Sequence, residues 1–295
     1  MRSVVVLQCA CAVMLAGCTR TNPAFDEVAG ESSGGDFVHG PVRTSWGLSH
    51  GSSDDASTGS DTGNPGAPRC ADFRWGSSHD GALWVIDLVR ERAGSWAKIE
   101  IGSLAIATDA DGDLVWLPFR EHDTDVRRFD PFDVDGTLER IPLALPDTRA
   151  FLGAEFDDAG RLWTLRVGTR LLYELELATG TLRPDRALEL DLGQDGDIAR
   201  VDGELQVVTA FSWLLDPNAP PRSLLLEADD APPAVATGLT AHGPDLWMSD
   251  VDGDMHRFSR GRLQERFSVG GPVTDLAPVR GTVEECARLA ALLDD

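Results

Sequence analysis

The feature that most constrains the fold of this chain is a turn pattern that recurs five times. In each copy a glycine stands two or three residues before a leucine, and the leucines recur about forty residues apart at Leu83, Leu114, Leu162, Leu205 and Leu246. Glycine supplies the positive φ of a tight hairpin turn. The alternation that follows places Leu on one sheet face and Trp on the other. Repeats of this length are typical of four-stranded propeller blades, which bury both faces of their middle strands.

Short apolar strands are expected on both sides of these turns. They lie upstream at residues 104–108, 151–156, 198–201 and 238–241, and downstream at residues 171–177 and 255–259. The order is strand, Gly turn, strand, connection, strand, turn and strand, once per unit. We therefore predict an all-β fold, with a β-propeller as the leading interpretation. A plain antiparallel sandwich is the alternative, because short strands punctuated by turns also describe it.

The repeat pattern of residues 70–279 resembles that of six-bladed propellers of the NHL and SMP-30/gluconolactonase type. Repeats of that type read Asp-x-x-Gly-x-Leu-Trp and continue into a second hairpin, as in Leu172-Tyr173-Glu174-Leu175 followed by Thr179-Gly180. Two departures weaken the match. Trp116 falls one residue later than its counterparts, and the fourth repeat has Gln206 where Trp is expected.

The blade count depends on how the two ends of the repeat region meet. The last unit stops after residues 273–279, and Thr282-Val283-Glu284-Glu285 has the pattern of a capping box that opens a short C-terminal helix reaching Leu293. We favour six blades for the domain at residues 70–295. Five blades result if the first and last fragments form one blade.

Cys70 and Cys286 stand at opposite ends of the folded region, and we predict a disulfide between them. Two separately buried thiols are the alternative, because sequence does not reveal proximity. Of the other cysteines, Cys9 and Cys11 fall within the predicted export signal and Cys18 is assigned to lipid.

The start of the chain has the form of an export signal. A short basic start and an apolar run at residues 4–15 lead to Leu15-Ala16-Gly17-Cys18. The run would rise only about 18 Å as a helix, well short of a bilayer core of about 30 Å. A buried N-terminal helix is the alternative interpretation, but the residues that follow offer it no partner face.

Leu-Ala-Gly-Cys resembles the lipobox of bacterial lipoproteins. The resemblance implies removal of residues 1–17, a diacylglycerol thioether on Cys18 and further fatty acylation, with palmitate among the chains. Two or three acyl chains anchor a protein stably, whereas one chain is marginal. Thr19 after the cysteine favours sorting to the outer membrane, so we expect a lipid-anchored, extracytoplasmic protein of the cell envelope. Residues 18–69, rich in Ser, Gly and Asp, are predicted to form a flexible tether.

The formal charge of the chain is −23, from 49 acidic and 26 basic residues. Such a charge repels phosphate backbones, so we expect no nucleic-acid partner. It also repels anionic headgroups, which leaves the lipid to hold the protein on the membrane.

Two acidic clusters are candidate Ca²⁺ sites, because calcium prefers six to eight oxygen ligands. They comprise Asp109, Asp111 and Asp113, and Asp250, Asp252 and Asp254. Neither fits an EF-hand loop, since the twelfth positions hold Arg120 and Gly261. Ordinary hairpin turns explain the same residues, because Asp and Gly are favoured there for backbone reasons. We predict no other cofactor.

No coherent catalytic set emerges from the sequence. Gly47-Leu48-Ser49-His50-Gly51 matches Gly-x-Ser-x-Gly but lies in the tether, without the strand and helix that a nucleophile elbow needs. None of the metal ligands of the gluconolactonase type can be assigned here. The leading hypothesis is a non-enzymatic scaffold that binds an envelope protein or glycan. The rival is a metal-dependent hydrolase or lactonase, which a convergent acidic cluster in the propeller channel would favour.

Overall fold

The computed structural model describes residues 69–294, except 100–101, 119–124, 134–135, 146–148, 189–195, 202–203, 210–212, 216–222, 226–235 and 260–261. The predicted export signal, the predicted lipidation site Cys18 and the predicted tether up to residue 68 therefore lie outside the described residues. Within them, no helix is long and apolar enough to cross a membrane.

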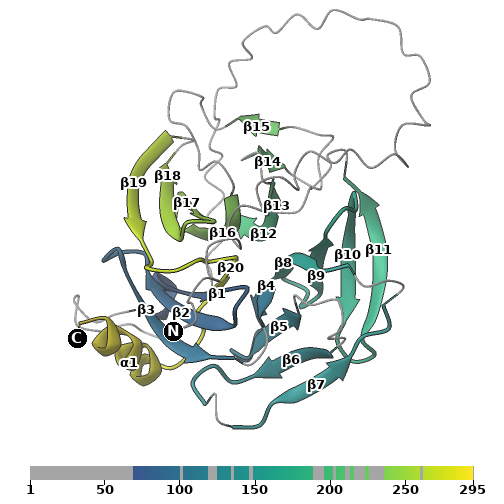
Figure 1. Cartoon of the computed structure of the whole chain (residues 1–295), viewed down its shortest axis with the longest axis horizontal. Helices are drawn as coiled ribbons and strands as arrows, with labels where there is room; N and C mark the ends of the chain where they lie inside the picture. Colours follow the sequence, from purple (N-terminus) through teal and green to yellow (C-terminus); the bar gives the residue numbers. More distant parts are fainter. Residues whose placement is uncertain are drawn as a thin grey trace, which may run out of the picture. The chain divides into compact units, whose positions relative to one another are not determined.

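The described strands form five antiparallel four-stranded sheets, which we call blades 1 to 5 (Figure 1). Blade 1 has the order β20-β1-β2-β3, and blades 2 to 5 follow as β4–β7, β8–β11, β12–β15 and β16–β19. Blade 1 comprises β1 (Phe73–Ser77), β2 (Ala82–Asp87), β3 (Arg92–Lys98) and β20 (Asp275–Pro278). Blade 2 comprises β4 (Ser103–Thr108), β5 (Leu114–Pro118), β6 (Asp125–Phe129) and β7 (Glu139–Pro142).

The other three blades repeat the same arrangement. Blade 3 comprises β8 (Phe151–Phe156), β9 (Leu162–Arg166), β10 (Leu171–Glu176) and β11 (Thr181–Ala187). Blade 4 comprises β12 (Gly196–Val201), β13 (Glu204–Thr209), β14 (Trp213–Leu215) and β15 (Ser223–Leu225). Blade 5 comprises β16 (Ala236–His242), β17 (Asp245–Asp250), β18 (Asp254–Ser259) and β19 (Arg262–Ser268). The all-β propeller prediction is confirmed.

The two ends of the repeat region complete one blade. The strand β20 pairs antiparallel with β1, from Arg74 opposite Pro278 to Ser77 opposite Asp275. The five inner strands β20, β4, β8, β12 and β16 then follow one another around a closed ring. The described strands thus follow the five-blade alternative rather than the favoured six, because the fragment counted as a sixth unit is the inner strand of blade 1.

The phase of the first repeat explains the difference in count. Trp116, Trp163 and Trp247 lie on second strands, β5, β9 and β17, whereas Trp84 lies on β2, the third strand of its blade. The second strand of blade 1 is β1, which carries Trp75. The first turn of the repeat therefore precedes the third strand of its blade, whereas the other turns precede the second strand of theirs. The local sequence pattern is nevertheless the same.

Each interface between neighbouring blades buries its own apolar cluster. Between blades 1 and 2 the cluster includes Trp75, Ile106 and Trp116, and between blades 5 and 1 it includes Ile86 and Trp247. Three further clusters join blades 2 to 3, 3 to 4 and 4 to 5. Both faces of the middle strands are consequently buried, as the Leu and Trp alternation predicts.

A helix and a disulfide close the molecule at the seam between blades 1 and 2. The helix α1 (Val283–Asp294) begins with the predicted capping box, in which Thr282 N donates to Glu285 Oε2 at 2.7 Å and Glu285 N donates to Thr282 Oγ1 at 3.3 Å. Cys70, in the short 3₁₀ helix η1 (Cys70–Asp72), is bonded to Cys286 of α1. The predicted disulfide is confirmed, and it joins residues 216 positions apart.

Candidate functional site

Two aspartates occupy equivalent places on inner strands and bind the backbone of the next blade. Asp275 of β20 accepts hydrogen bonds from Ile106 N of β4 at 2.6 Å and from its neighbour Leu276 N at 2.6 Å. Asp197 of β12 accepts them from Leu239 N of β16 and from Ile198 N. The described inner strands belong to different sheets and form no ladder with one another, so their buried N–H groups need another acceptor. The two carboxyl groups supply it.

The same two side chains also meet each other. A hydrogen bond joins Asp197 to Asp275, and both side chains are fully buried. Burial is the largest cause that raises the pKa of each carboxyl well above its ordinary value, and for Asp197 the charge of Asp275 adds to it. Two ionised carboxylates in one dry site repel each other, so burial and this contact favour a proton shared by the pair.

The inner strand β8 also packs against this pair, but it contributes no acidic side chain to it. A Cβ on Gly153 of β8 would lie 2.8 Å from both Asp197 Cα and Ile198 N, which is closer than real Cβ atoms approach. Glycine is therefore required for β8 to reach the centre of the ring. We call Asp197 and Asp275 the axial pair, because all five inner strands meet at it.

Glu155 of β8 is a further buried acid, and it makes no salt bridge with any residue that the structure describes. Its Oε1 accepts a hydrogen bond from Phe156 N at 3.1 Å. Burial raises the pKa of Glu155 to about 7, against the opposing charges of Arg200, Arg280 and Arg74. A carboxyl group with such a pKa can hold or release a proton near neutrality.

Arg74 of β1 is a buried cation at the seam between blades 1 and 5. Its guanidinium donates to Thr240 Oγ1 at 2.7 Å, to Phe73 O at 2.7 Å and to Ala71 O at 2.8 Å, and also to Ala241 O. Burial lowers its pKa to about 10, with Glu155 the largest opposing charge, so the side chain stays charged at neutral pH.

The first acidic cluster surrounds an arginine. Arg128 Nη2 lies 2.6 Å from Asp109 Oδ2, 3.1 Å from Asp113 Oδ2 and 3.6 Å from Asp111 Oδ2. Asp109 Oδ1 meanwhile accepts hydrogen bonds from the backbone N–H groups of Asp111 and Asp113. The guanidinium thus supplies the positive charge that a calcium ion would bring, and the turn uses the remaining oxygen.

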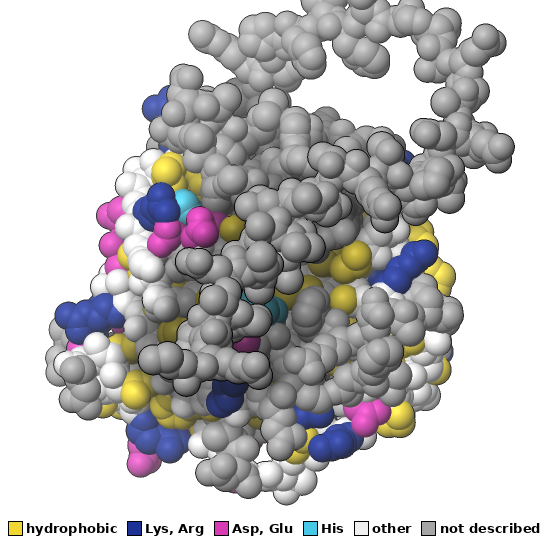
Figure 2. All heavy atoms as spheres, in the orientation of Figure 1, with side chains coloured by type: hydrophobic (Ala, Val, Ile, Leu, Met, Phe, Trp, Pro, Cys, Tyr) yellow, Lys and Arg dark blue, Asp and Glu magenta, His cyan; other side chains and the backbone are white. Residues whose placement is uncertain are grey.

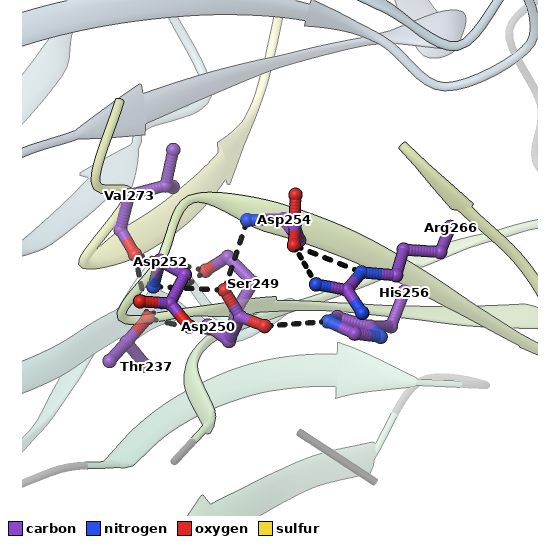
Figure 3. A network of polar contacts seen from close by, with 8 residues as sticks. All are labelled: Thr237, Ser249, Asp250, Asp252, Asp254, His256, Arg266 and Val273. Carbon is purple, nitrogen blue, oxygen red and sulfur yellow. Dashed lines mark hydrogen bonds and ion pairs between the residues drawn. The ribbon is translucent and has the colours of Figure 1, made fainter. Parts of the chain in front are cut away.

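The second acidic cluster is divided between two basic partners, His256 and Arg266 (Figure 3). Asp250 Oδ1 accepts from Asp252 N and Asp254 N, each at 3.0 Å, while its Oδ2 lies 2.8 Å from His256 Nε2. Asp254 Oδ2 accepts from Arg266 Nε at 2.9 Å. Within the described ranges, no group of three or more His, Cys, Asp or Glu side chains is arranged to hold a metal ion. Calcium binding at these turns stays a prediction.

The turn itself recurs in four places and accounts for the Asp-Gly spacing. In each, the first residue's side chain accepts a hydrogen bond from the backbone N–H of the fifth, and a glycine with positive φ stands fourth. The first residues are Ser78, Asp109, Asp157 and Asp250. The Asp-Gly pattern in the sequence therefore reflects the hydrogen bonds and the backbone conformation that these turns require.

The acids at the centre of the ring are not singled out by the sequence reasoning. Their available signal is an acidic residue inside an otherwise apolar strand, as in Gly196-Asp197-Ile198-Ala199 and Thr274-Asp275-Leu276-Ala277. Other surface charges pair locally, and Figure 2 shows basic and acidic side chains side by side at several places on the displayed face. Arg183 with Glu176 is one such pair, at 2.7 Å.

Comparisons with known proteins identify the fold and nothing narrower. No family model and no curated protein matches the sequence. The nidogen/laminin complex contains a chain that aligns at a TM-score of 0.51 and 13% identity, covering 70% of this chain and 97% of that one. A gluconolactonase from Xanthomonas campestris aligns at 0.46 and 17% identity, covering 69% and 78%. A virginiamycin B lyase from Staphylococcus aureus aligns at 0.41 and 13% identity, covering 68% and 72%.

Replacing Asp275 tests the structural role of the axial pair. Asp275→Ala removes the acceptor for Ile106 N and Leu276 N, and each buried donor left unpaired costs about 1–3 kcal/mol of unfolding free energy. Asp275→Asn keeps a carbonyl acceptor and carries no charge, so it is expected to destabilise less. Urea denaturation measures both, with Asp185→Ala on the exposed strand β11 as the matched control. Equal losses for Asn and Ala would contradict the assignment.

Glu155 makes the stability of the fold depend on pH. Because its pKa is about 7 when folded and about 4.5 as a free side chain, the native state binds more protons between these values. The free energy of unfolding therefore falls as pH rises from about 4.5 to about 7, by up to about 1.4 kcal/mol per pH unit for one proton. Glu155→Gln should reduce this slope in urea titrations at several pH values. An unchanged slope would show that other groups cause it.

Arg128 is predicted to prevent calcium from binding at the first cluster. The thermal midpoint of the wild-type chain should be the same in calcium and in chelator, because the guanidinium already occupies the place among the three carboxylates. In Arg128→Gln the unpaired carboxylates lower the midpoint, and calcium should restore part of the loss. Differential scanning calorimetry measures both effects, with Arg183→Gln as control. A calcium-dependent rise in the wild type would establish the site predicted from the sequence.

Proposed function

We propose that this chain is a lipid-anchored, extracytoplasmic β-propeller that serves as a binding scaffold in a bacterial cell envelope, for a protein or glycan partner. The proposed location in the cell envelope rests on the lipobox at residues 15–18. It is supported independently by the Cys70–Cys286 disulfide, because such bonds persist in oxidising compartments outside the cytoplasm. Anchoring at the outer membrane, suggested by Thr19, belongs to the same proposal.

The observation that carries the scaffold role is the use made of the central acids. Asp197 and Asp275 bind backbone N–H groups with both carboxylate oxygens and also bind each other. They are therefore committed to holding the blades together. A rigid ring of this kind can present its loops to a partner without using its centre for chemistry.

The rival function, a metal-dependent hydrolase or lactonase, draws on one observation. Glu155, with a pKa of about 7 and three arginines acting on it, has the proton affinity of a general acid or base. A panel of lactones and esters, assayed with calcium, manganese or zinc, separates the two functions. Turnover that requires metal and is lost in Glu155→Gln would contradict the scaffold function and support the enzyme function.

Lipid attachment is tested by metabolic labelling with an alkyne analogue of palmitate in a diderm bacterial host. The wild-type chain should carry the label and sediment with the membrane fraction, because two or three acyl chains anchor a protein stably. Cys18→Ser should lose the label and keep residues 1–17, seen as a larger mass. Cys70→Ser, which leaves the lipobox intact, is the control and should stay labelled. Label on Cys18→Ser, or an unlabelled wild type, would contradict the proposal.

A further inference from the structure

Basic side chains from two blades, Arg200 of blade 4 and Arg74 and Arg280 of blade 1, act on Glu155 near the place where the inner strands end. Gly153 of β8 lies against Asp197 and Ile198 of β12. Glu155 and Arg200 each follow two residues further along their strands, so they stand at the same level. Arg200 continues past the end of β8, where its Nη2 lies 2.5 Å from Asp158 Oδ2. Arg200 therefore passes from blade 4 to blade 3 beside Glu155.

Arg200 holds its present partner only loosely. Asp158 is a surface residue with 78% of its side chain exposed, and exposed ion pairs contribute little to stability. The Nε of Arg200, in contrast, is buried and has no acceptor among the residues that the structure describes. A buried donor without a partner is uncommon in folded proteins and calls for an explanation. An anion that enters from the solvent side could bind the guanidinium in place of Asp158.

Two further arginines add positive charge at the same place. Arg280, two residues beyond the end of β20, is exposed and has no polar partner among the described residues. Arg74 already donates to backbone carbonyls and to Thr240, so it contributes positive charge but no free pair of guanidinium N–H groups. Arg200, Arg280 and Arg74 all act on Glu155, in that order of size. Three cations around one buried acid stand out in a chain of net charge −23.

The acid within this group is able to lose its charge. The groups that face Glu155 are Arg200 on β12, Arg74 on β1, Arg280 after β20 and the buried Asp275 on β20. The strand β4, on the other side of β8, carries no titratable side chain between Ser103 and Thr108. When Glu155 is protonated, its charge no longer offsets those of the three arginines, and the local charge becomes more positive.

We infer that this end of the ring binds an oxyanion, a carboxylate or phosphate group of a ligand, on Arg200 and Arg280, with a proton taken up by Glu155. The inference rests on the proposed scaffold function and names the chemistry of its ligand. A bound anion raises the pKa of a neighbouring carboxyl group. Binding therefore draws a proton onto Glu155 and weakens as pH rises above about 7, the pKa of the free site.

Isothermal titration of the purified chain with sulfate tests the inference, because sulfate does not titrate near neutrality. Between pH 7 and pH 9 the affinity should fall by up to about tenfold per pH unit, as expected for uptake of one proton. Titrations in buffers of different ionisation enthalpy count that proton directly. Methyl phosphate and acetate, titrated in parallel, distinguish a phosphate ligand from a carboxylate.

Four variants assign the effect to the named residues. Glu155→Gln should bind sulfate without pH dependence, and Arg280→Gln, on an exposed side chain that the fold does not need, should weaken binding several-fold. Asp158→Asn should strengthen binding, because it releases Arg200. Arg183→Gln, an exposed arginine on β11, should match the wild type.

The inference is overturned if the wild type binds no sulfate, if Arg280→Gln binds as well as the wild type, or if the pH dependence persists in Glu155→Gln. None of these outcomes changes the result of the membrane labelling or of the metal-dependent turnover assay, which test the scaffold proposal. Failure of the anion site is thereby distinguished from failure of the scaffold proposal.

Discussion

The fold depends on a pair of carboxyl groups that replace a missing hydrogen-bond ladder. The inner strands of a propeller diverge, yet they carry backbone N–H groups that burial makes expensive to leave unpaired. Asp275 takes such a group from β4 and Asp197 takes one from β16, while the two side chains bind each other. The pair thus links β20 to β4, β12 to β16, and β12 to β20. Gly153 brings β8 into the same contact.

Ring closure is reinforced at the periphery by covalent means. Pairing of β20 with β1 unites the first and last fragments of the domain in blade 1. The Cys70–Cys286 bond then fixes α1 beside that blade, where Trp75, Trp96 and Phe132 pack with their ring centroids 5.5 to 6.2 Å apart. The axial pair and the Cys70–Cys286 disulfide therefore act on the same blade from opposite sides.

Much of this fold could be predicted from the sequence, because its turns follow local backbone rules. The positive φ at Gly112 or Gly253 needs only neighbouring residues, and so does the Asp that closes each turn. The C-terminal helix and the disulfide followed from similarly local or compositional signals. The phase of the first repeat could not be predicted, since Trp84 stands in the same local sequence as Trp163 but on a different strand of its blade.

The central acids escaped prediction for a different reason. Asp197 and Asp275 are 78 residues apart in the numbering, and their meeting depends on the closed ring. Likewise, the aspartates of the first cluster suggest calcium until Arg128, on the neighbouring strand β6, is placed among them. Charge at a site is set by residues that only the tertiary fold brings together.

These observations combine into one physical account of the protein. The hydrogen-bonded axial pair links the inner strands, the disulfide secures the closing blade, and another buried acid, Glu155, is acted on by three arginines.

The most direct test of the central claim is a carboxyl carbon-13 NMR titration of the axial pair, assigned with Asp197→Asn and Asp275→Asn. The account predicts that the pair keeps one shared proton at pH 7, with carboxyl resonances that titrate well above the range of the exposed aspartates. Resonances that show both side chains fully ionised at pH 7, with an ordinary pKa, would contradict it.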